Sequence, residues 1–363
     1  MLYSTGFEFE YALVTESGTF HDFGDLDFDA LQRALSDGSG ATDDGLVRGD
    51  LGIKSGYWYL EGDERFDVDG TFTTMLVKGV EIRTPICSST TEAADRLVEL
   101  EDDIAKRLAP LGLRLGLVGF NPVREAYVLD PPLNEWERQM RAEHREYDHA
   151  EVSNLSYGPD INLSFPGLSA DQVVELTRRL TYYSPFMVPF SFSSPFHAGK
   201  VWHGPSKRTY ERTWRRVAAR CFVDPPAGAE PTMVHPPRIP REEGRIEFKA
   251  FDAFLSRDLL LAGAALTLGV CLADDLPGLA DRPGRDLHQR AATAAFADPE
   301  IAAGARRVLA SARRALAERA DLRNELGHLD GLDQLLSQGR TPADSLLDAY
   351  SRTGLMYHPE GLR

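Results

Sequence analysis

Cysteine is scarce in this sequence of 363 residues, which holds only Cys87, Cys221 and Cys271. Three cysteines at wide, irregular spacing fit neither a disulfide framework nor a zinc site. Free cysteines of this kind usually pack as small apolar side chains. We therefore expect three buried thiols and a reducing compartment, the cytoplasm.

Positive charge is also in short supply: 40 Lys and Arg stand against 56 Asp and Glu, a net charge of −16. Nucleic-acid binding needs a basic surface, so no nucleic-acid partner is expected. The longest apolar run, residues 259–273, is shorter than the roughly 20 residues that span a bilayer. It predicts a buried helix and no membrane partner. The first expected strand begins close to Met1, which leaves no room for a signal peptide.

The common nucleotide-binding and nucleophile motifs are missing as well. There is no P-loop, no G-x-G-x-x-G fingerprint and no nucleophile elbow. The histidines, among them His197, His203 and His235, have no ligand spacing and are expected at the surface or in satisfied positions. Any ATP must therefore bind through metal ions and a sheet.

Four short segments alternate apolar and polar residues: 6–11, 80–83, 160–164 and 246–249. Side chains two apart in a strand share a face. One face would hold the apolar set, Phe7, Phe9, Val80, Ile82, Ile161, Leu163, Ile246 and Phe248. The other would hold Glu8, Glu10, Glu81, Asp160, Asn162 and Glu247, together with Arg83 and Lys249.

These oxygen ligands are the kind that Mg²⁺ prefers. A single segment of this kind is more typical of an antiparallel strand with one wet face than of a metal site. Its recurrence in four segments favours a metal site. Arg83 and Lys249 either form structural ion pairs or neutralise a transferring phosphoryl group, and their spacing leaves both open. The pattern predicts a phosphoryl-transfer site.

The order of expected elements predicts an α+β fold, with helices on the apolar face of a sheet. Residues 1–252 are rich in strands and residues 253–363 form a helical tail, within one catalytic domain of residues 1–363. Further strands are expected at 53–60, 71–83 and 113–118. Helices are expected at 91–108 with Thr91 as N-cap, 135–146, 169–183, 207–221, 287–296 and 299–323, and from Thr341. The proline-rich segment 222–244 is expected to be a loop that acts as a lid.

Residues 205–216 carry dense positive charge in an acidic chain. This segment is either a solvated basic helix face or part of a binding site beside the turn-rich residues 193–196. An arginine here can hold a substrate carboxylate through two parallel hydrogen bonds. Arg208 is the first candidate.

At these residues the chain resembles the glutamate–cysteine ligase superfamily, especially its bacterial carboxylate–amine ligase branch. The resemblance lies in Gly6-x-Glu8-x-Glu10, Glu81-Ile-Arg-Thr-Pro85, Ser193–Phe196 with Ser206-x-Arg208, Glu247-x-Lys249 with Asp252, and residues 339–344. Two positions depart from the family pattern. Asp160 replaces a histidine, and Lys249 replaces an arginine, which keeps the charge but loses the bidentate fork.

The resemblance implies a glutamine-synthetase-like fold, in which a curved, mainly antiparallel sheet holds ATP and two or three Mg²⁺ ions, or Mn²⁺. It implies that an acid, expected to be glutamate, is activated as an acyl phosphate and then joined to an amine, giving an amide. Glu8, Glu10, Glu81, Asp160 and Glu247 would hold the metals. Arg83 and Lys249 would stabilise phosphoryl charge. Arg208, Ser206 and Asn162 would bind the acid, and the helical tail could support a homo-oligomer.

Two other hypotheses stay open. The first is a guanidino or other small-molecule kinase built on a related sheet. The second is a non-catalytic nucleotide- or metal-binding homologue that has lost turnover through Lys249 or Asp160.

Overall fold

The computed structural model describes residues 3–36, 54, 56–144 and 147–362. Its centre is a sheet of nine strands within this part of the chain, in the order β10-β9-β11-β6-β1-β4-β3, with β2 and β5 also paired to β1. The strands are β1 (Ser4–Thr15), β2 (Phe20–His21), β3 (Trp58–Phe66), β4 (Phe72–Arg83), β5 (Leu113–Gly116), β6 (Pro159–Ser164), β9 (Ala219–Phe222), β10 (Val234–His235) and β11 (Arg245–Phe248). Every pair is antiparallel except β10 with β9. A separate hairpin joins β7 (Phe196–His197) to β8 (Lys200–Val201).

The two faces of this sheet differ as the alternation predicts. The eight apolar side chains expected on one face are all buried in the core, each at most 1% exposed. They lie on β1, β4, β6 and β11, which are neighbours in the sheet. The opposite face carries the charged residues described below. The predicted α+β class with a mainly antiparallel sheet is confirmed.

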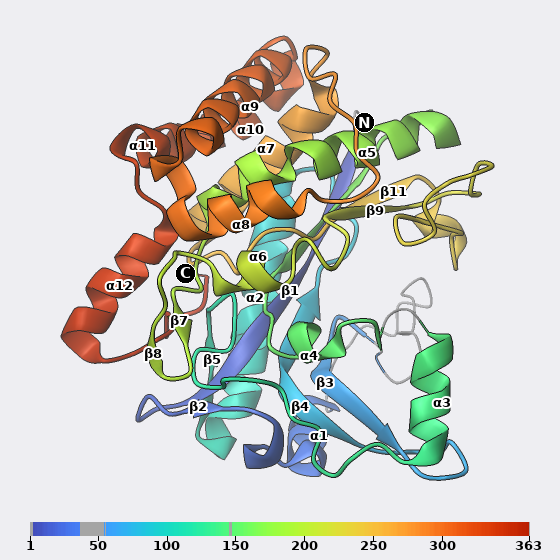
Figure 1. The fold of residues 1–363 in the computed structure, drawn as a ribbon, viewed down its shortest axis with the longest axis vertical. Coiled ribbons are helices and arrows are strands. Elements are labelled where there is room, and N and C mark those ends of the chain that lie inside the picture. The colour runs from blue at the N-terminus through green and yellow to red at the C-terminus, as the bar shows by residue number, and fades with distance from the viewer. Residues whose placement is uncertain (1–2, 37–53, 55, 145–146, 363) are drawn as a thin grey trace.

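Helices cover the apolar face, and more helices pack behind them (Figure 1). The helices are α1 (Phe28–Ser36), α2 (Thr90–Leu108), α3 (Glu135–Glu143), α4 (Ala150–Ser153), α5 (Ala170–Met187), α6 (Lys207–Glu211), α7 (Arg257–Leu272), α8 (Arg285–Ala294), α9 (Pro299–Ala317), α10 (Arg323–His328), α11 (Asp330–Gln338) and α12 (Pro342–Thr353). Helices α2, α5 and α7 contact the strands, and α9 packs on α5 and α7. The predicted helical tail is confirmed.

Helix α7 corresponds to the apolar run, and residues 260–271 of it are buried. It packs against α2, α5 and α9, so the expected buried helix is confirmed. In the described ranges, no helix combines the length and the apolar character that a bilayer crossing requires. The three cysteines are free and buried, also as predicted.

Some element boundaries were predicted wrongly. The helix expected over 207–221 ends at Glu211. Like charges recur there at intervals of four residues, at Arg208, Arg212 and Arg216, and such spacing destabilises a helix. Residues 219–222 instead pair with β11 as a strand, which buries Cys221. The N-cap of α2 is Ser89 rather than Thr91, because the Ser89 hydroxyl accepts from the Glu92 amide.

Two other predicted segments differ in part. The strand expected from residue 53 begins outside the described residues, and β3 runs from Trp58 to Phe66. The predicted loop 222–244 contains the short strand β10 and a 3₁₀ turn at Pro240–Glu242.

Candidate active site

A cavity of about 580 Å³ opens over the polar face of the sheet. Strands β1, β3, β4 and β6, the end of β11, and the α6 region supply its lining. Of the predicted polar residues, the following line it: Glu8, Glu10, Glu81, Arg83, Asp160, Asn162, Arg208 and Lys249. Glu247 is fully buried beside it and contacts the Lys249 ammonium.

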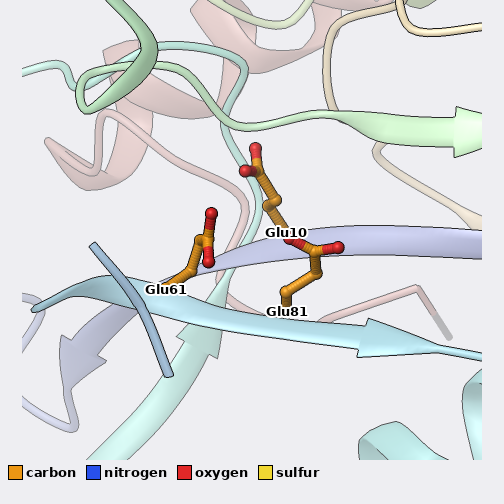
Figure 2. A group of neighbouring side chains, drawn as sticks. All are labelled: Glu10, Glu61 and Glu81. Carbon is orange, nitrogen blue, oxygen red and sulfur yellow. The ribbon is translucent and has the colours of Figure 1, made fainter. Parts of the chain in front are cut away.

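Strand register brings two of the predicted metal ligands together and adds a third glutamate. Glu10 on β1 lies directly opposite Glu81 on β4, and Glu61 comes from the neighbouring strand β3. One carboxylate oxygen from each of the three lies within 4.8 Å of the others. Figure 2 shows the three side chains rising from adjacent strands. We call Glu10, Glu61 and Glu81 the carboxylate cluster.

Like charges directly opposite one another destabilise a sheet, so the carboxylate cluster is costly without a cation. Burial, followed by the charge of Glu61, raises the pKa of Glu81 well above its usual range. Burial also raises the pKa of Glu61, although Lys54 opposes the shift. For Glu10, burial is outweighed by the Lys78 ammonium, and the pKa is lowered. Close carboxylate oxygens on partly or fully buried side chains suit a hard divalent cation such as Mg²⁺.

The other predicted metal ligands are held by protein cations. Glu247 lies 2.8 Å from Arg220 and 3.3 Å from Arg245, and Lys249 bridges it to Asp160. Glu8 lies 3.3 Å from Arg245. Arg220 and Lys249 outweigh burial and hold the pKa of Glu247 well below its usual range.

Asp160 behaves differently, although it contacts Lys249 as well. Burial raises its pKa to about 7, with further contributions from the charges of Glu247 and Glu8 and against the effect of Lys249. A metal ion at Asp160 and Glu247 would have to displace the Lys249 ammonium.

The predicted phosphoryl-binding residue Arg83 lines the cavity beside the carboxylate cluster. Its Nε donates to the Gly56 carbonyl at 2.6 Å, and its guanidinium packs over the Tyr59 ring. The Tyr59 hydroxyl in turn donates to Glu81 at 2.8 Å. The Arg83 guanidinium is thus connected through Tyr59 to Glu81 of the carboxylate cluster.

Arg208 is buried at the cavity wall. It donates to the Ala250 carbonyl at 2.9 Å and to the Lys249 carbonyl at 3.1 Å. Gly158 allows this close packing, because a Cβ there would lie 2.6 Å from an Arg208 nitrogen. Asn162 also faces the cavity, where its Nδ2 donates to Glu8 at 3.3 Å and its Oδ1 accepts from Arg245 at 2.9 Å.

Ser206 does not line the cavity. Its buried hydroxyl accepts from the Thr209 amide at 2.9 Å, which caps α6, and donates to Asp252 at 2.9 Å. The predicted substrate contact is replaced by a supporting role: Ser206 fixes the start of the helix that carries Arg208.

The sequence interpretation missed Glu61, Lys54, Lys78, Arg220 and Arg245. Alternation in residues 58–61 would have placed Glu61 on the same face as Tyr59. Alternation does not predict that the Lys78 side chain faces the cavity. The β3–β4 register pairs Glu61 with Gly79 and Gly62 with Val77, so Lys78 is an extra residue in a bulge. Bulges redirect side chains, and they are common next to active sites.

The family of the chain is identified by comparison with known proteins. Residues 6–226, well over half of the chain, match the family model described as glutamate-cysteine ligase family 2. Curated protein sequences gave no match. Among solved structures, glutamate–cysteine ligase (gshA) of Francisella tularensis in complex with AMP aligns with a TM-score of 0.58 at 11% identity, over 98% of this chain and 86% of that one.

A bifunctional glutathione synthetase of Pasteurella multocida aligns with a TM-score of 0.52 at 12% identity, over 98% of this chain and 52% of that one. The chain therefore spans about half of that bifunctional protein. At such low identity these two likenesses establish the fold alone, and the predicted glutamine-synthetase-like fold is confirmed. The family match carries the assignment: the chain belongs to glutamate–cysteine ligase family 2.

Proposed function

We propose that the protein is an ATP- and Mg²⁺-dependent carboxylate–amine ligase that forms an amide, expected to be a γ-glutamyl amide, through an acyl phosphate. The observation that carries the proposal is the convergence of Glu10, Glu61 and Glu81 in a cavity also lined by Arg83, Arg208 and Lys249. Phosphoryl transfer needs mainly positioning and charge neutralisation, and these residue types supply both.

In the first step, an oxygen of the acid's carboxylate attacks the γ-phosphorus of ATP, and the bond to ADP breaks. In the second, the amine nitrogen attacks the acyl carbon, phosphate leaves and the nitrogen loses a proton. Mg²⁺ held by the carboxylate cluster would offset the charge of the triphosphate when bound. Arg83 and Lys249, which line the same cavity, are proposed to neutralise charge on the transferring group.

Arg208 and Asn162 are proposed to hold the acid, because both face the cavity with polar groups. Glu8, Asp160 and Glu247 remain proposed ligands for a further metal ion. Their use requires Lys249 to move off Asp160 and Glu247, toward the phosphoryl group that it is proposed to neutralise. The cytoplasmic location and a homo-oligomer are likewise proposals from the sequence.

The test is release of ADP and phosphate when the protein is given ATP, Mg²⁺, glutamate and a panel of amines. Glutamate labelled with ¹⁸O in its γ-carboxylate should pass one labelled oxygen to the phosphate, because the acyl phosphate bridges through that oxygen. Amide formation without transfer of label contradicts the acyl-phosphate route. A stable phosphorylated product with no amide would indicate a kinase instead.

A further inference from the structure

Lys78 is a buried ammonium group inside the active-site cavity that the mechanism above does not use. The bulge in β4 turns its side chain toward Glu10, and the residue is 4% exposed. Its Nζ donates to Glu10 Oε1 at 2.7 Å, to the Ser156 carbonyl at 2.9 Å and to the Ser153 carbonyl at 3.3 Å. A lysine ammonium has three protons, and all three are taken. Lys78 is therefore a fixed charge with no donor left for a phosphate.

Lys54 plays a similar part at the second glutamate of the carboxylate cluster. Its Nζ lies 2.5 Å from Glu61 and 3.3 Å from Glu64. Both lysines line the cavity. Glu81, in contrast, has a hydrogen bond from the Tyr59 hydroxyl and no ion pair among the described residues. Two of the three carboxylates thus already have a cation as neighbour.

Such neighbours oppose the binding of a free metal ion. A divalent cation at the carboxylate cluster would lie close to two ammonium groups, and burial leaves little water to screen the repulsion. The acidic oxygens attract the ion, and the lysines cancel much of that attraction. A bound triphosphate would add several negative charges on the open side of the site and restore the balance.

We infer that Lys78 and Lys54 make metal binding depend on the nucleotide, so that the divalent ion enters the site as its complex with ATP or together with it. This inference rests on the proposed function only in placing the metal at the carboxylate cluster. The lysines act by charge on the metal equilibrium and contact no reacting atom, so they are positioning residues rather than catalytic ones.

The experiment titrates MnCl₂ into the protein, alone and with excess ADP, and follows free Mn²⁺ by its electron paramagnetic resonance signal. Wild-type protein should bind Mn²⁺ weakly alone and much more tightly with ADP. Lys78→Met should tighten binding of Mn²⁺ alone by about tenfold or more and reduce the enhancement by ADP. Lys78→Arg, which keeps the charge, should behave as wild type. Lys106→Met is the matched control, because Lys106 is an exposed lysine paired with Asp103.

Unchanged or weaker binding of Mn²⁺ alone to Lys78→Met overturns the inference, since Lys78 would then serve only to orient Glu10. If Lys78→Met does not fold, Lys54→Met carries the same test, and Lys54 is the more exposed of the two. Wild-type protein that binds no Mn²⁺ even with ADP would instead contradict the proposed function.

Discussion

Glu81 is the member of the carboxylate cluster that has no ion pair among the described residues. It is 8% exposed, lies opposite Glu10, and has a pKa raised by burial and by four neighbouring carboxylates. A glutamine there would accept the same hydrogen bond from Tyr59 without the repulsion. Glu81→Gln should therefore stabilise the metal-free protein by up to about 1 kcal/mol while abolishing ligase activity. Urea unfolding in the presence of EDTA measures the first effect. Lower stability of the variant would show that the repulsion has been overestimated.

Glu61 is the ligand that the sequence interpretation missed, and its role can be tested separately. Glu61→Gln keeps the shape and removes the charge. We expect the Mg²⁺ concentration for half-maximal activity to rise by at least the roughly 10- to 100-fold typical of a disturbed metal site. Glu99→Gln is the control, because Glu99 is exposed and lies 2.6 Å from Arg96, its ion-pair partner in the described part of the chain. An unchanged Mg²⁺ dependence in Glu61→Gln would remove it from the metal site.

For individual residues, the sequence correctly predicted the side chains that follow the period of two along a strand. Glu8, Glu10, Glu81 and Asp160 reach the cavity because their strands alternate without interruption there. Lys78 could not be predicted, because a bulge shifts the alternation by one residue. The predicted contact of Ser206 with the substrate was also misplaced, since a hydroxyl before a helix serves equally well as its N-cap.

Among the helices, α7 and α9 approach closely at Gly269. A Cβ at this position would lie 2.6 Å from the Ala312 Cβ and 2.9 Å from its Cα. Gly269→Val should therefore destabilise the protein by about 1–3 kcal/mol, as overpacking does. Gly331→Ala in α11 is the matched control: nothing lies within 4 Å of its Cβ position, so the higher helix propensity of alanine should give up to about 1 kcal/mol of stability. Chemical denaturation compares them, and equal effects would contradict the close packing.

Helix α8 contributes a pH-dependent contact through His288. The ring is fully buried, its Nδ1 lies 2.7 Å from the Gly284 carbonyl, and its Nε2 lies 3.0 Å from the Ser184 hydroxyl. Burial lowers the pKa of His288 to about 4, against the effect of the Gly284 carbonyl. The folded protein therefore favours the neutral form of the His288 imidazole ring. Its contribution is complete above the unfolded pKa of about 6.5 and is lost as the pH falls toward 4.

His288 should accordingly remove about 2 kcal/mol from the free energy of unfolding between pH 7 and pH 5. His288→Gln, which does not titrate, should lack this part of the pH dependence. Urea unfolding of both proteins at the two pH values measures the difference. Parallel pH profiles would show that His288 takes up its proton in the folded state as readily as in the unfolded one.

Helices with a clear apolar period or a long apolar run were predicted well, whereas strands that depend on a distant partner were not. The local sequence alone was sufficient to predict helices α2 and α7. Residues 219–222 form a strand because β11 lies beside them, a contact that no local pattern reveals. The helix expected there followed from local propensity, which tertiary pairing overrode.

In the whole molecule, sheet and helical tail share one hydrophobic core. That core includes Phe7 and Phe248 from the sheet together with Leu266, Val308 and Leu332 from α7, α9 and α11. The order of strand-rich and helical halves predicted this α+β arrangement. The strand order itself was not predicted: β1 pairs with strands far along the chain, and no local pattern in the sequence reveals such pairing.

The proposed function requires Glu10, Glu61 and Glu81 to bind the divalent cation that accompanies the nucleotide. Crystals grown with MnCl₂ and ADP, measured at the manganese absorption edge, test it without any knowledge of the acid or the amine. We expect an anomalous peak roughly 2–2.5 Å from a carboxylate oxygen of each of these glutamates and next to the ADP phosphates. Bound ADP with no peak at the carboxylate cluster, or with manganese held elsewhere, would contradict it.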